Sequence, residues 1–136
     1  MNTKIFISII LLLSQVFESC NNEAQGTVQQ LNYTKSTIQV IQFHSEHRCM
    51  TCNKIESLTK ETLKSYPQIA FVLVNVDDKK NEKIAEQFEA TGTALFLYNP
   101  TTKKKKDLTD FAFMNAGDKD KFTKELKKHI DDFFKQ

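Results

Sequence analysis

The chain has 136 residues, of which 40% are hydrophobic, 26% charged and 10% aromatic. Its 19 basic and 17 acidic side chains give a net charge of only +2, which argues against a polybasic nucleic-acid binder or an acidic tail protein. Three cysteines are too few for a small protein held together by disulfides. We therefore expect one compact domain with an apolar core and no nucleic-acid partner.

Residues 1–19 have the pattern of an export signal. Lys4 supplies positive charge, and residues 5–17 form an apolar run. The run is too short for a membrane span of about 20 residues but suits the apolar region of a signal peptide. Ser19 precedes Cys20 directly, which resembles a bacterial lipoprotein signal in which the cysteine is lipidated. We expect a protein of the bacterial cell envelope, periplasmic or surface-facing, held to the membrane by a lipid on Cys20; simple signal cleavage is the alternative.

Residues 20–34 are rich in Asn and Gln and have little to bury, so we expect a tether that ends in a short strand at 28–33. Residues 35–136 are predicted to form the domain. Its first strand is expected at 37–43, where apolar and β-branched residues point to both faces.

A helix is predicted from Cys52, because apolar residues recur at spacings of three and four as far as Tyr66. Pro67 is expected to end this helix. Residues 69–76 are almost continuously apolar, which predicts a strand buried on both faces of a central, partly parallel sheet.

The rest of the chain predicts a short helix at 81–89, a strand at 94–98 and its hairpin partner at 108–114. Asp118 is expected to cap a last helix. The order of elements predicts an α/β domain in which a central mixed sheet is flanked by helices. The apolar stripe of the last helix consists of Phe122, Leu126, Ile130, Phe133 and Phe134, of which the last two cannot both face inward.

The chemistry of the chain is expected at a C-x-x-C sequence, Cys49 to Cys52, where the first strand gives way to the first helix. A sulfur at a helix N-terminus meets unpaired backbone N–H groups and the helix dipole, which favour the thiolate. Arg48 and His47 add positive charge on the same turn. We predict that Cys49 attacks a target disulfide and that the more buried Cys52 resolves the mixed disulfide. The positive neighbours predict a relatively oxidising couple, because they stabilise the reduced thiolate form.

Two other interpretations of the cysteines stay open. An inert structural disulfide is one, although so short a loop restrains the unfolded chain little. The other is a metal or metalloid site, since His44, His47, Cys49 and Cys52 supply two imidazoles and two sulfurs. We favour a redox pair that uses neither metal nor organic cofactor, with His44 as a candidate proton carrier.

The order of elements and the position of the C-x-x-C resemble the thioredoxin superfamily over residues 28–135. Residues 43–56 (FHSEHRCMTCNKIE) also resemble a bacterial thioredoxin-like family with the pattern F-H-x3-R-C-x-T-C-x2-I-E. That family is described as a nitrophenyl-compound nitroreductase subunit associated with arsenic-resistance operons. The resemblance implies a thioredoxin-like fold and a protein thiol, protein disulfide or reductase subunit as partner. It also implies an alternative role as a non-catalytic subunit, because a domain of this size without a flavin motif is not expected to reduce a nitro group alone.

The chain departs from thioredoxin in the residues around the cysteines. Arg48 precedes the first cysteine where thioredoxins carry tryptophan. The proline that precedes the third core strand of thioredoxins is replaced by Thr93 or Ala94. That proline hinders metal binding, so its absence keeps the metal interpretation open.

The buried aspartate of thioredoxins corresponds to Gln42 or Phe43 in this chain. No carboxylate is therefore evident to take the proton of Cys52, unless His44 or Glu56 serves instead.

Overall fold

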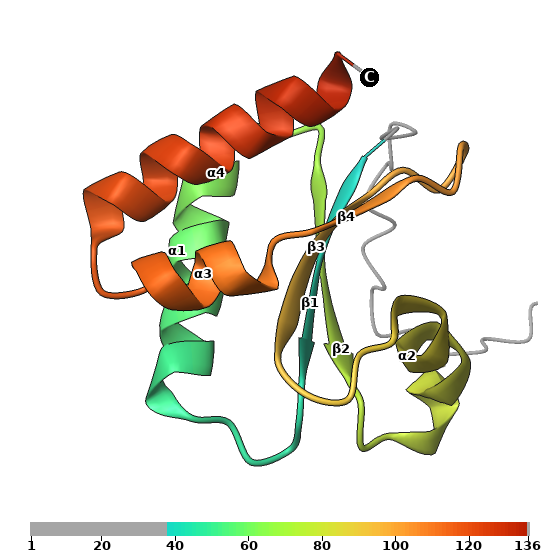
Figure 1. Cartoon of the computed structure of the whole chain (residues 1–136). Helices are drawn as coiled ribbons and strands as arrows, with labels where there is room; N and C mark the ends of the chain where they lie inside the picture. Colours follow the sequence, from blue (N-terminus) through green and yellow to red (C-terminus); the bar gives the residue numbers. More distant parts are fainter. Residues whose placement is uncertain (1–37, 136) are drawn as a thin grey trace, which may run out of the picture. The chain divides into compact units, whose positions relative to one another are not determined.

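The computed structural model describes residues 38–135, which form a four-stranded mixed sheet with helices on both faces (Figure 1). The central strand β1 pairs parallel with β2 and antiparallel with β3, and β3 pairs antiparallel with β4. This arrangement confirms the predicted α/β class. The strands are β1 (Gln39–His44), β2 (Ala70–Asn75), β3 (Ala94–Tyr98) and β4 (Lys105–Asp107), in the sheet order β2-β1-β3-β4.

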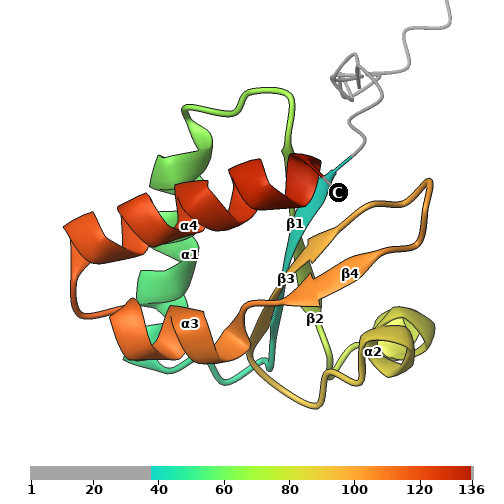
Figure 2. The same ribbon diagram turned by 45° about the horizontal axis from the view of Figure 1, so that its top comes forward.

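Three helices cover one face of the sheet and one covers the other (Figures 1 and 2). The first group contains α1 (Met50–Leu63), α3 (Thr109–Asn115) and α4 (Lys119–Phe134). The opposite face carries α2 (Glu82–Phe88), which follows the 3-10 turn η2 (Lys79–Asn81). Within residues 38–135, none of the helices has the length and apolar character that a membrane crossing requires.

The expected export signal at 1–19 and the tether at 20–34, with its strand at 28–33, lie outside the described residues. So does Cys20, the expected lipid attachment site. These remain predictions from the sequence.

The strand β1 has both of its faces buried. Val40 belongs to the larger core, which lies against α1, α3 and α4, whereas Ile41 and Phe43 belong to a smaller core against α2. The smaller core is aromatic, and the ring of Phe43 lies 5.3 Å from that of Phe88, centroid to centroid. Because side chains alternate along a strand, Gln42 points with Val40 to the face that α1 covers. This direction places an amide beneath the candidate site.

The prediction that the strand after α1 is buried on both faces was wrong. In the described part of the sheet β2 is an outer strand, and Leu73 keeps 39% of its surface exposed. The strands buried on both faces are β1 and β3, which are the two inner strands of the described sheet. An apolar run shows how much a strand can bury, but its position in the sheet depends on which strands pair beside it.

The predicted hairpin partner of β3 was also wrong. The partner is Lys105–Asp107, and most of the expected segment 108–114 is helix α3. The Asp107 carboxylate accepts a hydrogen bond from the Thr109 N–H at 2.7 Å, which helps to start the helix. Leu108 and Ala112, four positions apart, are both buried in the larger core, so this segment follows a helical period.

The remaining elements are of the predicted type, but α1 ends at Leu63, so Tyr66 lies outside the helix and Pro67 is not what ends it. The β3 strand has the expected bounds, and α2 lies within the expected 81–89. Asp118 caps α4 by accepting a hydrogen bond from the Lys121 N–H at 3.0 Å. Phe133 is buried while Phe134 keeps 43% of its surface exposed, as their adjacency requires.

Candidate functional site

The two cysteines of the C-x-x-C lie at the start of α1, in different environments. Cys49 is the N-cap residue, with an extended backbone, and is exposed. Cys52 lies in the first turn and keeps only 5% of its surface exposed. The Cys52 N–H donates to the Cys49 sulfur at 3.2 Å. The helix therefore directs one of its unpaired N–H groups at the exposed sulfur, as an N-cap acceptor requires.

Both thiols are free in this structure. Burial acts to raise the pKa of the Cys52 thiol, but hydrogen bonds with Cys49 and Thr93 outweigh it, so the pKa lies below its ordinary value. The contact with Thr93 joins the Cys52 Sγ and the Thr93 Oγ1 at 2.9 Å. Thr93 comes from the loop just before β3, so the buried sulfur is in contact with a residue far away in the sequence.

Gln42 lies fully buried beneath the first turn of α1. Its Nε2 donates to the Cys52 carbonyl oxygen at 3.0 Å, while its Oε1 is buried with no hydrogen-bond partner. The neighbouring Phe43 points to the opposite face and packs against α2. Of the two residues that the sequence matched to the buried aspartate of thioredoxins, Gln42 is therefore the one beneath the cysteines. It presents a neutral amide that cannot take a proton from Cys52.

Arg48, expected to support the Cys49 thiolate, is paired with an acid on α1. Its Nη2 lies 2.5 Å from the Glu56 Oε2, and Glu56 also pairs with Lys60. Burial acts to raise the pKa of Glu56, but the hydrogen bonds from Lys60 and Arg48 outweigh it and hold the pKa below its ordinary value. Glu56 is therefore a carboxylate engaged with two cations, and part of the Arg48 charge is offset.

Of the two histidines of the segment, His44 is the last residue of β1 and His47 lies on the turn between β1 and α1. His47 is exposed, and its carbonyl oxygen accepts from the Ser45 hydroxyl at 3.2 Å. His44 is half-buried, and its Nδ1 lies 3.0 Å from the Ser45 carbonyl oxygen. The structure shows no hydrogen bond between either imidazole and a cysteine of the described chain.

The metal interpretation requires His44, His47, Cys49 and Cys52 to converge. Across residues 38–135, no three or more His, Cys, Asp or Glu side chains are grouped so that they could hold a metal ion. The four candidate ligands are thus not assembled in this structure.

Two hydrogen bonds that the sequence did not reveal hold the turn between β1 and α1 in place. The Glu46 N–H donates to the Asp77 Oδ2 at 2.7 Å, and the Asp77 N–H donates to the Asn75 Oδ1 at 3.1 Å. The turn before Cys49 is thereby fastened to the segment after β2. Asp77 carried no local signal for this contact, since it lies 31 positions from Glu46.

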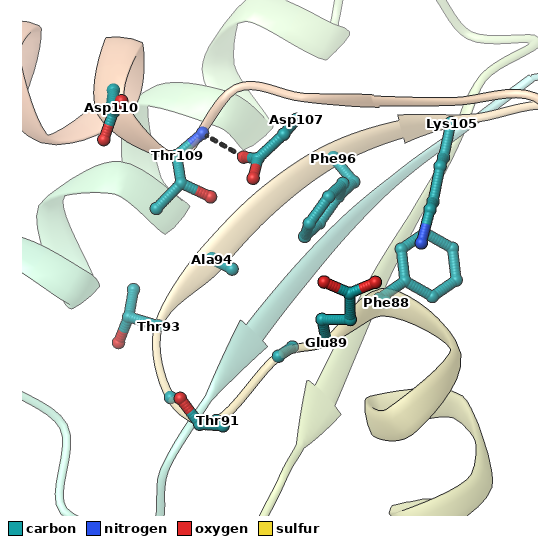
Figure 3. Close-up of a pocket in the computed structure, with 12 residues that line it drawn as sticks. Phe88, Glu89, Thr91, Thr93, Ala94, Phe96, Lys105, Asp107, Thr109 and Asp110 are labelled. Atoms are coloured by element: carbon teal, nitrogen blue, oxygen red, sulfur yellow. Dashed lines mark hydrogen bonds between the residues drawn. The ribbon is translucent and has the colours of Figure 1, made fainter.

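A cavity of about 580 Å³ lies beside the loop that carries Thr93 (Figure 3). One wall is the segment from Phe88 to Ala94, and the other is formed by residues of β4 and the start of α3. The rings of Phe88 and Phe96 form its apolar part, and Glu89, Asp107 and Asp110 bring carboxylates to it. The loop at Thr93 therefore borders a cavity that is also lined by two aromatic residues of the smaller core.

No protein-family model matches the chain, and no curated protein matches it. Solved structures do resemble it. Fasciola hepatica thioredoxin is 24% identical with a TM-score of 0.43, and the match covers 54% of this chain and 66% of that one. Arabidopsis thaliana thioredoxin O2 in the oxidised state is 19% identical with a TM-score of 0.44, over 52% and 60%. Chlamydomonas reinhardtii thioredoxin f2 is 22% identical with a TM-score of 0.45, over 63% and 83%.

The chain spans less than two thirds of the first three thioredoxins that it matches, at 66%, 60% and 59% of their lengths. Because these overlaps are partial, the fold class rests on the chain's own elements. A mixed sheet in the order β2-β1-β3-β4, with helices on both faces, is the α/β arrangement that the order of elements predicted. This domain carries a Cys49–Cys52 pair at the start of its first described helix.

Proposed function

We propose that this protein is an exported thiol–disulfide oxidoreductase, or an electron-relay subunit, that uses Cys49 and Cys52. The observation that carries the proposal is the asymmetry of the pair. Cys49 is exposed at the N-cap of α1 and receives the Cys52 N–H, whereas Cys52 is buried one turn further on. An exposed sulfur stabilised by a helix N-terminus suits attack on a partner, and a buried neighbour suits the second, intramolecular step.

The reaction transfers two electrons from the dithiol to a partner disulfide. The Cys49 thiolate attacks one partner sulfur, the partner's S–S bond breaks, and the departing thiolate takes up a proton. Cys52 then loses its proton and attacks the Cys49 sulfur. The mixed disulfide breaks, a Cys49–Cys52 disulfide forms, and the second partner sulfur leaves as a thiol. The same steps in reverse oxidise a partner dithiol.

Positive charge on the turn sets the expected redox poise. His47 is exposed two positions before Cys49, and the Glu56 carboxylate, which is shared with Lys60, offsets only part of the effect of the Arg48 charge. Stabilising the thiolate of the reduced form raises the reduction potential of the pair. We therefore expect a relatively oxidising couple, with His44 at the end of β1 as the candidate proton carrier.

The proposed setting is the bacterial cell envelope. The signal-like residues 1–19 and the cysteine that follows support export and a lipid on Cys20, which would hold the domain at a membrane. The resemblance of residues 43–56 to a nitroreductase subunit family supports a reductase subunit as partner. A direct check is metabolic labelling with a fatty-acid analogue in a bacterial host: we expect label on the wild type and none on Cys20→Ser, and equal labelling of both would contradict the anchor.

The central experiment measures the redox chemistry of the full chain, kept in detergent because of its apolar residues 5–17. Equilibration in glutathione buffers gives the reduction potential, and insulin reduction gives the activity. Both should be lost in Cys49→Ser and in Cys52→Ser and kept in Cys20→Ser, the matched control. A pair that fails to exchange with glutathione would overturn the proposal.

A further inference from the structure

The contact between Thr93 and Cys52 reaches the sulfur that performs the second step. The Thr93 Oγ1 lies 2.9 Å from the Cys52 Sγ, well within reach of a hydrogen bond to sulfur. The contact joins residues 41 positions apart, so it depends on the fold. The loop that carries Thr93 leads into β3, and two hydrogen bonds fix the start of β3. The Leu95 N–H donates to the Thr109 hydroxyl at 3.1 Å, and the Leu95 carbonyl oxygen accepts from the Leu108 N–H at 2.7 Å.

The direction of this hydrogen bond depends on the charge of Cys52. A neutral thiol can donate to the Thr93 oxygen or accept from it. A thiolate can only accept, so the hydroxyl must then donate. A hydrogen bond to a charged group is stronger than one to a neutral group. The contact therefore favours the thiolate of Cys52 over its thiol.

The mixed disulfide changes which donors surround Cys52. In the free dithiol, hydrogen bonds with both Cys49 and Thr93 act to lower the pKa of Cys52. Once the Cys49 sulfur is bonded to a partner sulfur, it carries no S–H to donate. Of these two side-chain partners of the Cys52 sulfur within residues 38–135, Thr93 is then the one that can still donate.

We infer that Thr93 serves the second step of the exchange, by donating its hydroxyl hydrogen to the Cys52 thiolate as that sulfur attacks the mixed disulfide. The inference rests on the proposed function. In the step, the Cys52 proton leaves, the Cys52 sulfur bonds to the Cys49 sulfur, and the bond from Cys49 to the partner breaks. The departing partner thiolate takes up a proton, so the protons balance.

Other titratable groups near Cys52 have different partners. The neighbouring β1 residue Gln42 is neutral and bonds to the Cys52 carbonyl, not to its sulfur. The turn, α1 and the end of β1 also carry several ionisable groups besides the cysteines: His44, Glu46, His47, Arg48, Lys54, Glu56, Lys60 and Glu61. The structure shows no hydrogen bond or ion pair between any of these eight side chains and the Cys52 sulfur within residues 38–135.

The first test separates the two steps with an aromatic disulfide whose thiolate leaving group absorbs light. The full chain in detergent, carrying Cys20→Ser, should release one equivalent when Cys49 attacks and a second when Cys52 resolves. Thr93→Val keeps the shape of the side chain but removes its hydrogen-bond donor. It should leave the first release unchanged and slow the second about threefold near pH 7, because the higher nucleophilicity of a more basic thiolate offsets part of the roughly tenfold loss of thiolate. The pH profile of the second release should move to higher pH, and Thr93→Ser should restore both its rate and its profile.

A second measurement does not require exchange activity. In a chain that carries Cys20→Ser and Cys49→Ala, Cys52 is the one remaining cysteine, so its alkylation followed against pH reports the proton affinity of this thiol alone. Adding Thr93→Val should raise that affinity about tenfold, and adding Thr93→Ser should leave it unchanged. Thermal unfolding of each variant shows that it is folded.

The outcomes distinguish the two proposals. A wild type with no second release would overturn the proposed function, while the alkylation data would still decide the role of Thr93 as a donor to Cys52. An unchanged affinity in the Thr93→Val variant would overturn the inference. Equal slowing of both releases, or a failure of Thr93→Ser to restore the second, would overturn it as well.

Discussion

Gln42 is fully buried beneath the cysteines, and only one of the two polar atoms of its side-chain amide forms a hydrogen bond. Its Nε2 donates to the Cys52 carbonyl, and its Oε1 has no partner. The donor position is fixed chemically, because the facing carbonyl oxygen can only accept. A buried acceptor without a partner carries a desolvation cost, which a leucine at this position would avoid while losing the hydrogen bond.

Replacing Gln42 by glutamate should make stability depend on pH. A protonated glutamic acid can still donate to the Cys52 carbonyl, whereas a buried carboxylate faces that oxygen unpaired. Burial therefore raises the folded-state pKa of the new residue above its unfolded value of about 4.3. The contribution of the protonated side chain to the free energy of unfolding should be complete below that value. The free energy of unfolding should then fall as the pH rises, by roughly 2 kcal/mol or more between about pH 5 and pH 8.

Urea unfolding of Gln42→Glu and of the matched control Gln42→Leu at several pH values measures this effect. The control has no titrating group at the position, so its difference from wild type should stay constant with pH. A parallel pH response of the two variants would contradict burial of residue 42.

At the scale of elements, a side-chain hydrogen bond joins the segment after α1 to α4. The Tyr66 hydroxyl donates to the Asp131 Oδ1 at 2.8 Å. Burial and the hydrogen bond to this carboxylate raise the pKa of Tyr66 to about 12. Because the contact is near the surface, solvent screening keeps its contribution small.

Tyr66→Phe should lower the free energy of unfolding by about 0.5–1 kcal/mol at neutral pH. The raised pKa means that this contribution is present below the ordinary tyrosine pKa of about 10 and is lost as the pH rises through about 12. The difference in stability between wild type and variant should therefore shrink over that window. Denaturant unfolding across the alkaline range measures it, and a difference that grows with pH would contradict the assigned contact.

The N-terminus of α4 depends on its cap. Asp118 accepts from the Lys121 N–H, and α4 supplies much of the larger core. Asp118→Ala should cost about 1 kcal/mol, because it leaves an N–H of the first turn without an acceptor. Asp118→Asn keeps an acceptor and should cost clearly less. Equal losses in the two variants, measured by urea unfolding, would show that the cap is not what stabilises this end.

At the scale of the whole molecule, α4 is held by its apolar stripe against the sheet and α1. Leu126 is fully buried, whereas Phe134 on the same helix is 43% exposed. Leu126→Ala should lower the free energy of unfolding by about 2–5 kcal/mol, because it leaves a cavity in the larger core. Phe134→Ala, which removes a larger side chain, should cost under about 1 kcal/mol. The reverse order of the two losses would contradict the orientation of α4.

Much of the fold could be predicted because its signals are local. The spacing of Cys52, Ile55 and Leu58 marks one helix face, and β3 is a short apolar run between turns. The wrong hairpin partner has a physical cause. Lys105 and Lys106 form β4 although they are polar, because their backbone pairs with β3 while the Lys105 ammonium reaches the Gln87 carbonyl and the Phe88 ring.

The sequence by itself determined that this is an α/β domain, that Cys49 lies at the start of a helix, and that Cys52 follows one turn later in the same helix. Both features follow from short-range periodicity, which fixes where a helix begins and which face it buries. Only the tertiary structure decided that β1 is central, that Gln42 points beneath α1 and that Thr93 contacts Cys52. These are contacts between segments distant in the chain, and they depend on which elements pack together, which local periodicity does not encode.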